Sequence, residues 1–186
     1  MTPCTSIVRD LLAGHVPADD SERESLRRIR DLVETASAPF SRAHFAPGHL
    51  TASGIVLNAE RSRTLLIFHT KLQRWLQPGG HFEDGENDPS VAAAREVIEE
   101  TGIATRWPGA APLVLDVDVH LIPARKADPY HFHFDLRMLL IAEPGEIRVQ
   151  EVAEARWCAP HEFDALKLDP GTIRALKKCG LSSTAL

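Results

Sequence analysis

The chain has few cysteines, and this scarcity excludes two common ways of stabilising a small protein. It has three cysteines among 186 residues, Cys4, Cys158 and Cys179. Their number is odd, their spacing is wide, and no two have the separation typical of zinc ligands. We therefore expect free thiols in a reducing compartment, without a disulfide framework or a cysteine-ligated zinc site.

The chain also lacks a long apolar run. A transmembrane helix needs about twenty predominantly apolar residues, and the sequence has no such stretch. Near the N-terminus, Arg9 and Asp10 stand where a signal peptide would place its apolar core. These absences predict a cytoplasmic protein that does not bind membranes.

Neither sign of charge dominates the chain. It has 21 basic and 26 acidic side chains, for a formal net charge of −5. This balance gives no general attraction to nucleic-acid backbones, so a phosphate-bearing ligand has to be bound by local groups. The length fits one domain with a sizeable core.

A glycine-rich turn followed by an acidic helix is the strongest local feature that the sequence does contain, over residues 79–103. Asp88 is suited to cap the predicted helix, and Pro89 is suited to its first position, where no amide donor is needed. Gly102 can adopt the left-handed conformation that ends a helix. About three to four turns lie between these signals.

Three glutamates share one face of this predicted helix. Glu96, Glu99 and Glu100 stand at i, i+3 and i+4, which gathers their carboxylates at about 3.6 residues per turn. Three neighbouring anions repel one another, and a divalent cation that prefers hard oxygen ligands would relieve the repulsion. Arg95 lies one turn before Glu99 and can hold that carboxylate. The pattern predicts a site for a cation of the Mg²⁺ type.

This stretch resembles the Nudix box, whose pattern is G-x5-E-x7-R-E-U-x-E-E-x-G-U with U aliphatic. The residues on its fixed positions are Gly80, Glu86, Arg95, Glu96, Val97, Glu99, Glu100, Gly102 and Ile103. One departure is visible, because eight residues, 87–94, separate Glu86 from Arg95 where the pattern has seven. We expect the extra residue in the loop that enters the helix, where an insertion costs little.

The resemblance implies a fold and a reaction. The fold is α/β, a Nudix-type α/β/α sandwich with a mixed sheet, expected over residues 46–186. The reaction is hydrolysis of a pyrophosphate linkage in a nucleoside diphosphate joined to another group X, with Mg²⁺ or Mn²⁺ as cofactor. The expected ligand is therefore a small nucleotide or another diphosphate.

The resemblance also assigns roles to residues. The metal ligands that it implies are the carbonyl of Gly80 and the side chains of Glu86, Glu96, Glu99 and Glu100. Glu96, Glu99 and Arg95 are the expected catalytic residues, with Glu96 as the preferred general base and Arg95 orienting the carboxylates. Glu151, six residues before Trp157, is a reserve base or metal ligand.

Residues 1–45 are predicted to form an N-terminal helical extension. Ser21 and Glu24 have the spacing of a capping box, and an apolar stripe follows them at Leu26, Ile29 and Leu32 or Val33. The stripe has to be buried against the main domain or against a partner chain. A homodimer is therefore a possible assembly.

Several stretches of residues 46–186 are predicted to be strands. Residues 51–58 and 64–70 are expected to form a hairpin, and residues 146–149 and 155–158 two short strands, followed by a helix over residues 173–178. Residues 113–122 and 130–141 alternate between apolar and polar residues, as half-buried strands do. Their polar faces have Asp116, Asp118 and His120 on the first strand, and His131, His133, Asp135 and Arg137 on the second.

These two polar faces are expected to line a substrate cleft. The predicted substrate contacts are His81, in the glycine-rich turn, together with His133 and Arg137. The pair His131 and His133 has three open interpretations, which are zinc ligation, a solvated strand face and substrate contact.

Two other functions stay open. Some Nudix-like domains sense nucleotides without hydrolysing them, but these tend to lose the box glutamates, all of which are present here. Isopentenyl-diphosphate isomerase shares the fold, but it needs a catalytic cysteine in the cleft. None of the three cysteines lies in the box or in the two strands expected to line the cleft.

Overall fold

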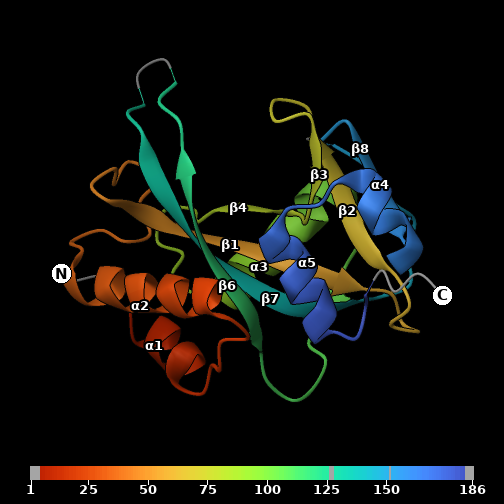
Figure 1. Ribbon diagram of the computed structural model, residues 1–186, viewed down its shortest axis with the longest axis horizontal. Helices are drawn as coiled ribbons and strands as arrows, with labels where there is room; N and C mark the ends of the chain where they lie inside the picture. Colours follow the sequence, from red (N-terminus) through yellow and green to blue (C-terminus); the bar gives the residue numbers. More distant parts are fainter. Residues whose placement is uncertain (1–4, 126–127, 151, 183–186) are drawn as a thin grey trace.

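A curled mixed sheet with helices on both faces forms the body of the protein in the computed structural model (Figure 1), which describes residues 5–125, 128–150 and 152–182. The helices are α1 (Ser6–Ala13), α2 (Asp20–Thr35), α3 (Pro89–Thr101), α4 (Phe163–Leu166) and α5 (Pro170–Lys178), with a 3₁₀ turn at Pro160–Glu162. The strands are β1 (Gly48–Leu57), β2 (Thr64–His69), β3 (Arg74–Leu76), β4 (Gly79–His81), β5 (Thr105–Arg106), β6 (Val114–Ile122), β7 (His131–Ala142) and β8 (Glu154–Cys158).

A long parallel pair, β1 and β7, forms the centre of the sheet. Its register runs from Gly48 opposite Phe132 to Leu57 opposite Ile141. The other pairings are antiparallel: β6 and β5 with β7, β2 and β4 with β1, and β3 and β8 with β2. The sheet is therefore mixed, as the family resemblance implied.

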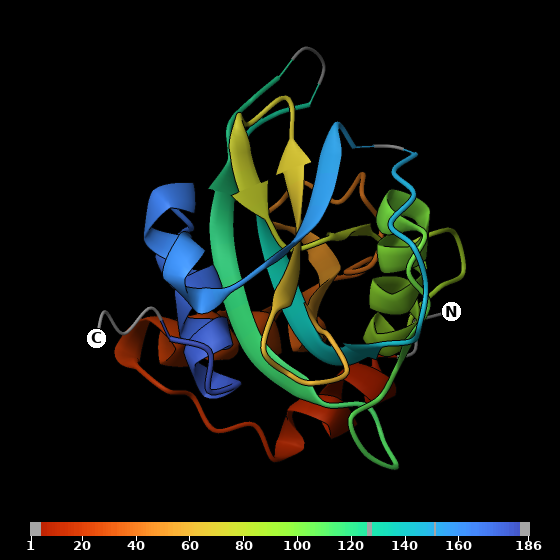
Figure 2. The same cartoon turned by 90° about the vertical axis from the view of Figure 1, so that its right-hand side faces the viewer.

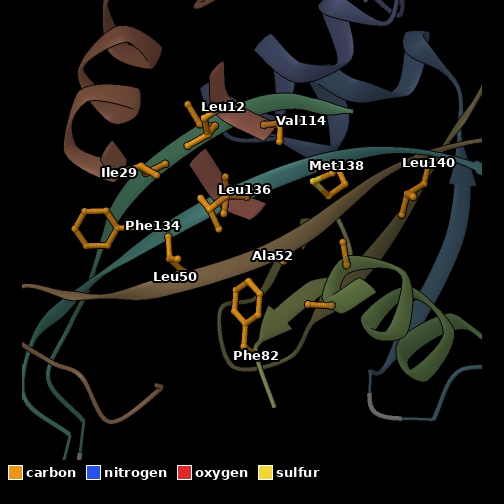
Figure 3. Close-up of a cluster of buried hydrophobic side chains, with 14 of the residues drawn as sticks. Leu12, Ile29, Leu50, Ala52, Phe82, Val114, Phe134, Leu136, Met138 and Leu140 are labelled. Atoms are coloured by element: carbon orange, nitrogen blue, oxygen red, sulfur yellow. The ribbon is translucent and has the colours of Figure 1, made fainter. Parts of the chain in front are cut away.

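The helices cover the sheet on both sides. Figure 2 shows α3 on one side and α4 and α5 on the other. The core beside α3 contains Leu50, Ala52, Phe134, Leu136 and Met138 from β1 and β7, and Figure 3 shows these side chains in one layer with Phe82. A second core packs α4 and α5 against the opposite face. This layering confirms the predicted α/β/α sandwich.

The N-terminal helices α1 and α2 pack against the sheet of their own chain. Leu12 of α1 and Ile29 of α2 are buried in the core beside Val114 of β6 and Phe134 of β7 (Figure 3). The apolar stripe of α2 is therefore covered by this chain's own sheet, while a homodimer and the domain boundary at residue 45 stay predictions. The start of α2 differs from the expected capping box, because Asp19 is the cap and accepts a hydrogen bond from the Glu22 amide at 2.8 Å.

Of the strands predicted from the sequence, the hairpin is confirmed and one short strand is not. The hairpin is present as β1 and β2, although β1 begins earlier than expected, at Gly48. The expected strand over residues 146–149 is wrong, since that segment has no regular secondary structure, whereas β8 and α5 are present. Within the described part of the chain, no helix combines the length and apolarity that a membrane span requires.

Candidate active site

Helix α3 begins and ends at the residues that the sequence indicated. Asp88 accepts hydrogen bonds from the amide and the hydroxyl of Ser90, at 2.9 and 2.7 Å, and Pro89 takes the first helical position. Gly102 has a φ of 72°, and its amide donates to the Ile98 carbonyl. These caps fix the register of the helix, and hence the direction in which its glutamates point.

The helix lies very close to the sheet. A Cβ atom at Gly54 of β1 would lie 2.8 Å from Val97 Cγ2 and 2.9 Å from Leu140 Cδ1. Ala92, Ala93 and Val97 are fully buried on this side of α3. The packing therefore turns the glutamate face away from the core and toward β4.

Glycines of β4 allow the backbone to touch the glutamates of α3. The Gly79 amide donates to Glu100 Oε2 at 3.0 Å, and Glu100 is 9% exposed. A Cβ atom at Gly80 would lie only 2.6 Å from Glu96 Oε1, so any other residue would displace that carboxylate. Glu96 and Glu100 are thus held against the loop at the position where the resemblance places the Gly80 carbonyl as a ligand.

Arg95 connects the remaining groups. Its Nη1 donates to Glu96 Oε1 at 3.0 Å and to Glu99 Oε2 at 2.8 Å. Its Nη2 donates to Glu86 Oε2 at 2.9 Å and to the His81 carbonyl at 2.8 Å. Burial disfavours the charged guanidinium, but the hydrogen bonds to Glu86 and Glu96 outweigh burial and raise the pKa of Arg95. We call Glu86, Glu96, Glu99 and Glu100 the carboxylate cluster.

The extra residue of the box does not remove Glu86 from this cluster. The turn that contains Glu86 is closed by its own hydrogen bonds, from the Glu86 amide to the Glu83 carbonyl and from the Glu83 amide to Glu86 Oε2, both at 3.0 Å. The chain then reaches the Asp88 cap through one residue, Asn87. The insertion is therefore absorbed before α3, and the Glu86 side chain still meets Arg95.

Arg137 lies in a buried network of aspartates. Its side chain is 3% exposed and lies within 3.5 Å of carboxylate oxygens of Asp116, Asp118 and Asp135. Gly171 of α5 packs directly over it, since a Cβ atom there would lie 2.6 Å from Nη1. A guanidinium that is already surrounded by carboxylates and covered by a helix stabilises the packing of α5 on the sheet. This position does not support the predicted contact between Arg137 and substrate.

Four histidines gather on the face of the sheet that also has Arg137, and one of them, His81, lies on β4. The His49, His131 and His133 rings have centroids 4.9 to 5.3 Å apart, and the His81 ring lies 5.1 Å from His49 and 5.0 Å from His133. We call these residues the histidine cluster. Burial is the main cause that lowers the pKa of His49 and His81 to about 4, and that of His133 to about 2. These three rings are therefore neutral at physiological pH.

Strand β4 joins the histidine cluster to the carboxylate cluster. The His81 carbonyl accepts the hydrogen bond from Arg95, whereas the His81 ring faces His49 and His133. The structure thus brings the rings of the predicted substrate contacts His81 and His133 together, and the backbone of His81 connects them to Arg95 of the carboxylate cluster.

Other sequence predictions lie elsewhere. Glu151 is outside the described residues. Cys158 and Cys179 belong to the second core, beside α4 and α5, and burial raises the pKa of each thiol to about 11. Neither thiol is beside α3, where isomerase chemistry would need one.

Sequence reasoning missed His49, because the predicted strand began at Thr51. The signal was present, since His49, Thr51 and Ser53 alternate with Leu50 and Ala52 as the two faces of a strand do.

Comparison with known proteins assigns the family. The family model described as NUDIX domain matches residues 48–179, so the chain belongs to the NUDIX domain family. A curated relative from Streptomyces rubellomurinus (strain ATCC 31215) is a CMP-5'-(N-acetyl-N-hydroxy-3-aminopropyl)phosphonate hydrolase. It is 43% identical over an alignment of 156 residues, which covers 80% of this chain and 70% of the relative. The family and this relative define the chain as an enzyme, a hydrolase of the Nudix type.

Solved structures agree on the fold. A NUDIX family hydrolase from Clostridium perfringens has a TM-score of 0.52 and 21% identity, and the match covers 72% of this chain and 97% of that one. A MutT NUDIX hydrolase from Burkholderia pseudomallei has a TM-score of 0.52 and 26% identity, over 69% of this chain and 95% of that one. The NUDIX domain of Shewanella oneidensis NrtR, solved with ADP ribose, also has a TM-score of 0.52 but 12% identity, over 81% of this chain and 96% of that one. At that identity, the similarity to NrtR shows the fold alone.

Proposed function

We propose that this enzyme hydrolyses a nucleotide in which a nucleoside monophosphate is joined through an anhydride to a second phosphate or to a phosphonate. The observation that carries the proposal is the complete carboxylate cluster, which Arg95 and the Gly79–Gly80 backbone hold together. The curated relative acts on a CMP-linked phosphonate, and this chain has the box glutamates that such hydrolysis needs.

The donor set fits a divalent cation with oxygen preference. Glu96, Glu99, Glu100 and the Gly80 carbonyl offer hard oxygen atoms only, the ligand type of Mg²⁺ and Mn²⁺. A cation bound there would neutralise charge on the phosphate oxygens and on the leaving group as the anhydride is cleaved. Glu86 stands at the far side of Arg95, and we infer that it supports the cluster rather than meeting the cation first.

The chain's own residues would then position the attack. Glu96 is the preferred general base, because its carboxylate is held by Arg95 and is packed against Gly80, where it can accept a proton from a water molecule near the anhydride. Arg95 offsets the repulsion among Glu86, Glu96 and Glu99, so the cluster stays assembled before substrate arrives. We infer that His81, which follows Gly80 in the chain and whose ring faces His49 and His133, contacts the substrate.

Retained glutamates also separate this proposal from nucleotide sensing. A sensing domain binds its nucleotide without hydrolysing it, so it does not require carboxylates positioned for catalysis against a glycine backbone. We therefore propose hydrolysis, and a nucleotide that binds and survives would instead indicate a sensor.

A substrate panel tests the proposal. The panel contains a CMP-linked phosphonate, nucleotide sugars, dinucleoside polyphosphates and nucleoside triphosphates, each with Mg²⁺, with Mn²⁺ and with excess chelator. Nucleoside monophosphate is quantified by chromatography. We expect cation-dependent release from at least one member. Absence of release from every member, with nucleotide binding retained, would contradict the proposal.

A further inference from the structure

The histidine cluster has the composition of a metal site that differs from the carboxylate cluster. One ring nitrogen from each of His49, His131 and His133 lies within 4.8 Å of the other two. Neutral imidazoles suit Zn²⁺, Cu²⁺, Ni²⁺ and Co²⁺, whereas Mg²⁺ prefers oxygen. The two clusters therefore differ in the kind of ion that they select.

The strand register places these histidines on rigid backbone. His49 of β1 lies directly opposite His133 of β7, and His131 is two residues from His133 on the same face. Thr51 of β1 lies opposite His81 of β4, so His81 extends the same row. Hydrogen-bonded strands hold all four residues, and such positions are more exact than loop positions.

Hydrogen bonds to backbone carbonyls fix the orientation of two of the rings. His49 Nδ1 lies 3.2 Å from the His44 carbonyl, and His131 Nδ1 lies 2.9 Å from the Pro129 carbonyl. A carbonyl can only accept, so each Nδ1 has a proton, and the lone pair that each ring can offer a metal is on Nε2. Histidine ligands of metals are commonly oriented by such a bond from the second ring nitrogen.

One of these lone pairs has no partner. His49 is 1% exposed, and its Nε2 is buried without a hydrogen-bond partner among the described residues. A buried polar atom without a partner costs about 1–3 kcal/mol, so its retention needs an explanation. The Phe45 ring, 5.0 Å from the His131 ring and 6.4 Å from the His49 ring, flanks this position with apolar surface.

We propose that His49, His131 and His133 bind a divalent ion of the Zn²⁺ type at a second metal site. In a tetrahedral site with bonds of about 2.0–2.1 Å the nitrogens lie about 3.3 Å apart, so a bound ion would draw each of the three inward by about 1 Å. Three protein ligands leave a fourth coordination position open to water or to another ligand. The site goes beyond the proposed hydrolysis, which the carboxylate cluster performs.

Metal titration tests the proposal without relying on turnover. Chelator-treated protein is titrated with Zn²⁺ by calorimetry and with Co²⁺ by visible absorption, because tetrahedral Co²⁺ absorbs much more strongly than octahedral Co²⁺. We compare wild type with His133→Gln, with Glu100→Gln, and with the matched control His161→Gln, whose side chain is exposed in the 3₁₀ turn. His131→Asn replaces His133→Gln if circular dichroism shows that His133→Gln is unfolded.

We expect one tight Zn²⁺ equivalent in wild type, in His161→Gln and in Glu100→Gln, with the Co²⁺ spectrum of a tetrahedral site. His133→Gln should weaken binding by at least about 100-fold, because losing a ligand exceeds the 10–100-fold cost of losing an outer-shell partner. No saturable Zn²⁺ binding in wild type would overturn the proposal. Binding that survives His133→Gln and is lost in Glu100→Gln would overturn it too, because the ion would then be on the carboxylates. Failure of the substrate panel would leave this test unaffected.

Discussion

Substitution of Gly80 by alanine isolates the fit between β4 and Glu96. Alanine keeps the backbone carbonyl that we propose as a metal ligand, and φ of Gly80 is not positive, so alanine adopts this backbone without strain. The new Cβ would lie 2.6 Å from Glu96 Oε1, whereas ordinary contact begins at 3.4 Å. The Glu96 carboxylate therefore has to retreat by about 0.8 Å.

The size of this retreat sets the expected loss. A misplacement of about 1 Å in a reacting group can cost about 100-fold in rate, equivalent to about 2.7 kcal/mol of transition-state stabilisation. The stability of the fold should change by less than about 1 kcal/mol, because the displaced atoms are the end of a side chain and no core packing is lost. The variant thus separates catalysis from folding.

The assay measures kcat/KM on the best member of the substrate panel over a range of Mg²⁺ concentrations, together with thermal unfolding. Gly109→Ala is the matched control, because no atom of the described residues, its chain neighbours aside, lies within 4 Å of its Cβ position and its φ is not positive. We expect Gly109→Ala to match wild type in both measurements. If Gly80→Ala kept kcat/KM within about threefold of wild type, with the same Mg²⁺ dependence, Glu96 could not depend on its contact with Gly80 and the proposed base would be wrong.

Three further predictions concern the rest of the molecule. Glu100→Gln should lower kcat strongly and should reduce the stabilisation by Mg²⁺ in thermal melts. The fold should survive, because an amide oxygen can still accept the hydrogen bond from the Gly79 amide. An equal Mg²⁺ effect on the melting of both proteins would remove Glu100 from the site. Arg137→Met should cost about 3–5 kcal/mol in urea unfolding at pH 7, because it removes the guanidinium that pairs with the buried Asp135 carboxylate, whereas Asp116 keeps its ion pair with Arg174. Burial raises the pKa of Asp118, but the hydrogen bond to His120 and the Arg137 charge outweigh burial and lower it. The stabilisation that follows from this lowered pKa is present above the unfolded pKa of about 3.9 and is lost as the pH falls further, through the folded pKa. The penalty should therefore persist down to about pH 4 and shrink below it, and an equal penalty at pH 7 and at about pH 3 would contradict the assignment. Deleting residues 1–40 should prevent stable folding or cause the chain to associate, since burial of each apolar side chain contributes about 1.5–3 kcal/mol; size-exclusion chromatography measures the association. A truncated protein that is stable and monomeric but loses turnover would reassign this segment to substrate binding.

The alternating stretches show the limit of what can be predicted for single side chains. Both strands were expected with their polar faces, and both are present as β6 and β7. The same alternation put Arg137 and His133 on one face, yet α5 covers Arg137 and leaves His133 only partly buried. Periodicity assigns a residue to a face, but it does not say what packs over each position on that face.

The sequence by itself determined helix α3, its caps and the shared face of Glu96, Glu99 and Glu100. These features depend on residues within about four positions of one another, where helix geometry and capping chemistry act without help from the rest of the chain. The family, the mixed sheet and the hydrolase class followed from that one stretch. Local chemistry was therefore enough to predict the carboxylate cluster.

Only the tertiary structure decided which distant residues meet this cluster. The ion pair between Arg95 and Glu86 depends on the path of a loop with one extra residue. The histidine cluster depends on the register of β1, β4 and β7, whose histidines lie up to 84 positions apart, from His49 to His133. A shift of one residue in that register would turn these side chains to the opposite face. Register between strands so far apart is set by packing of the whole sheet, and no local pattern in the sequence specifies it.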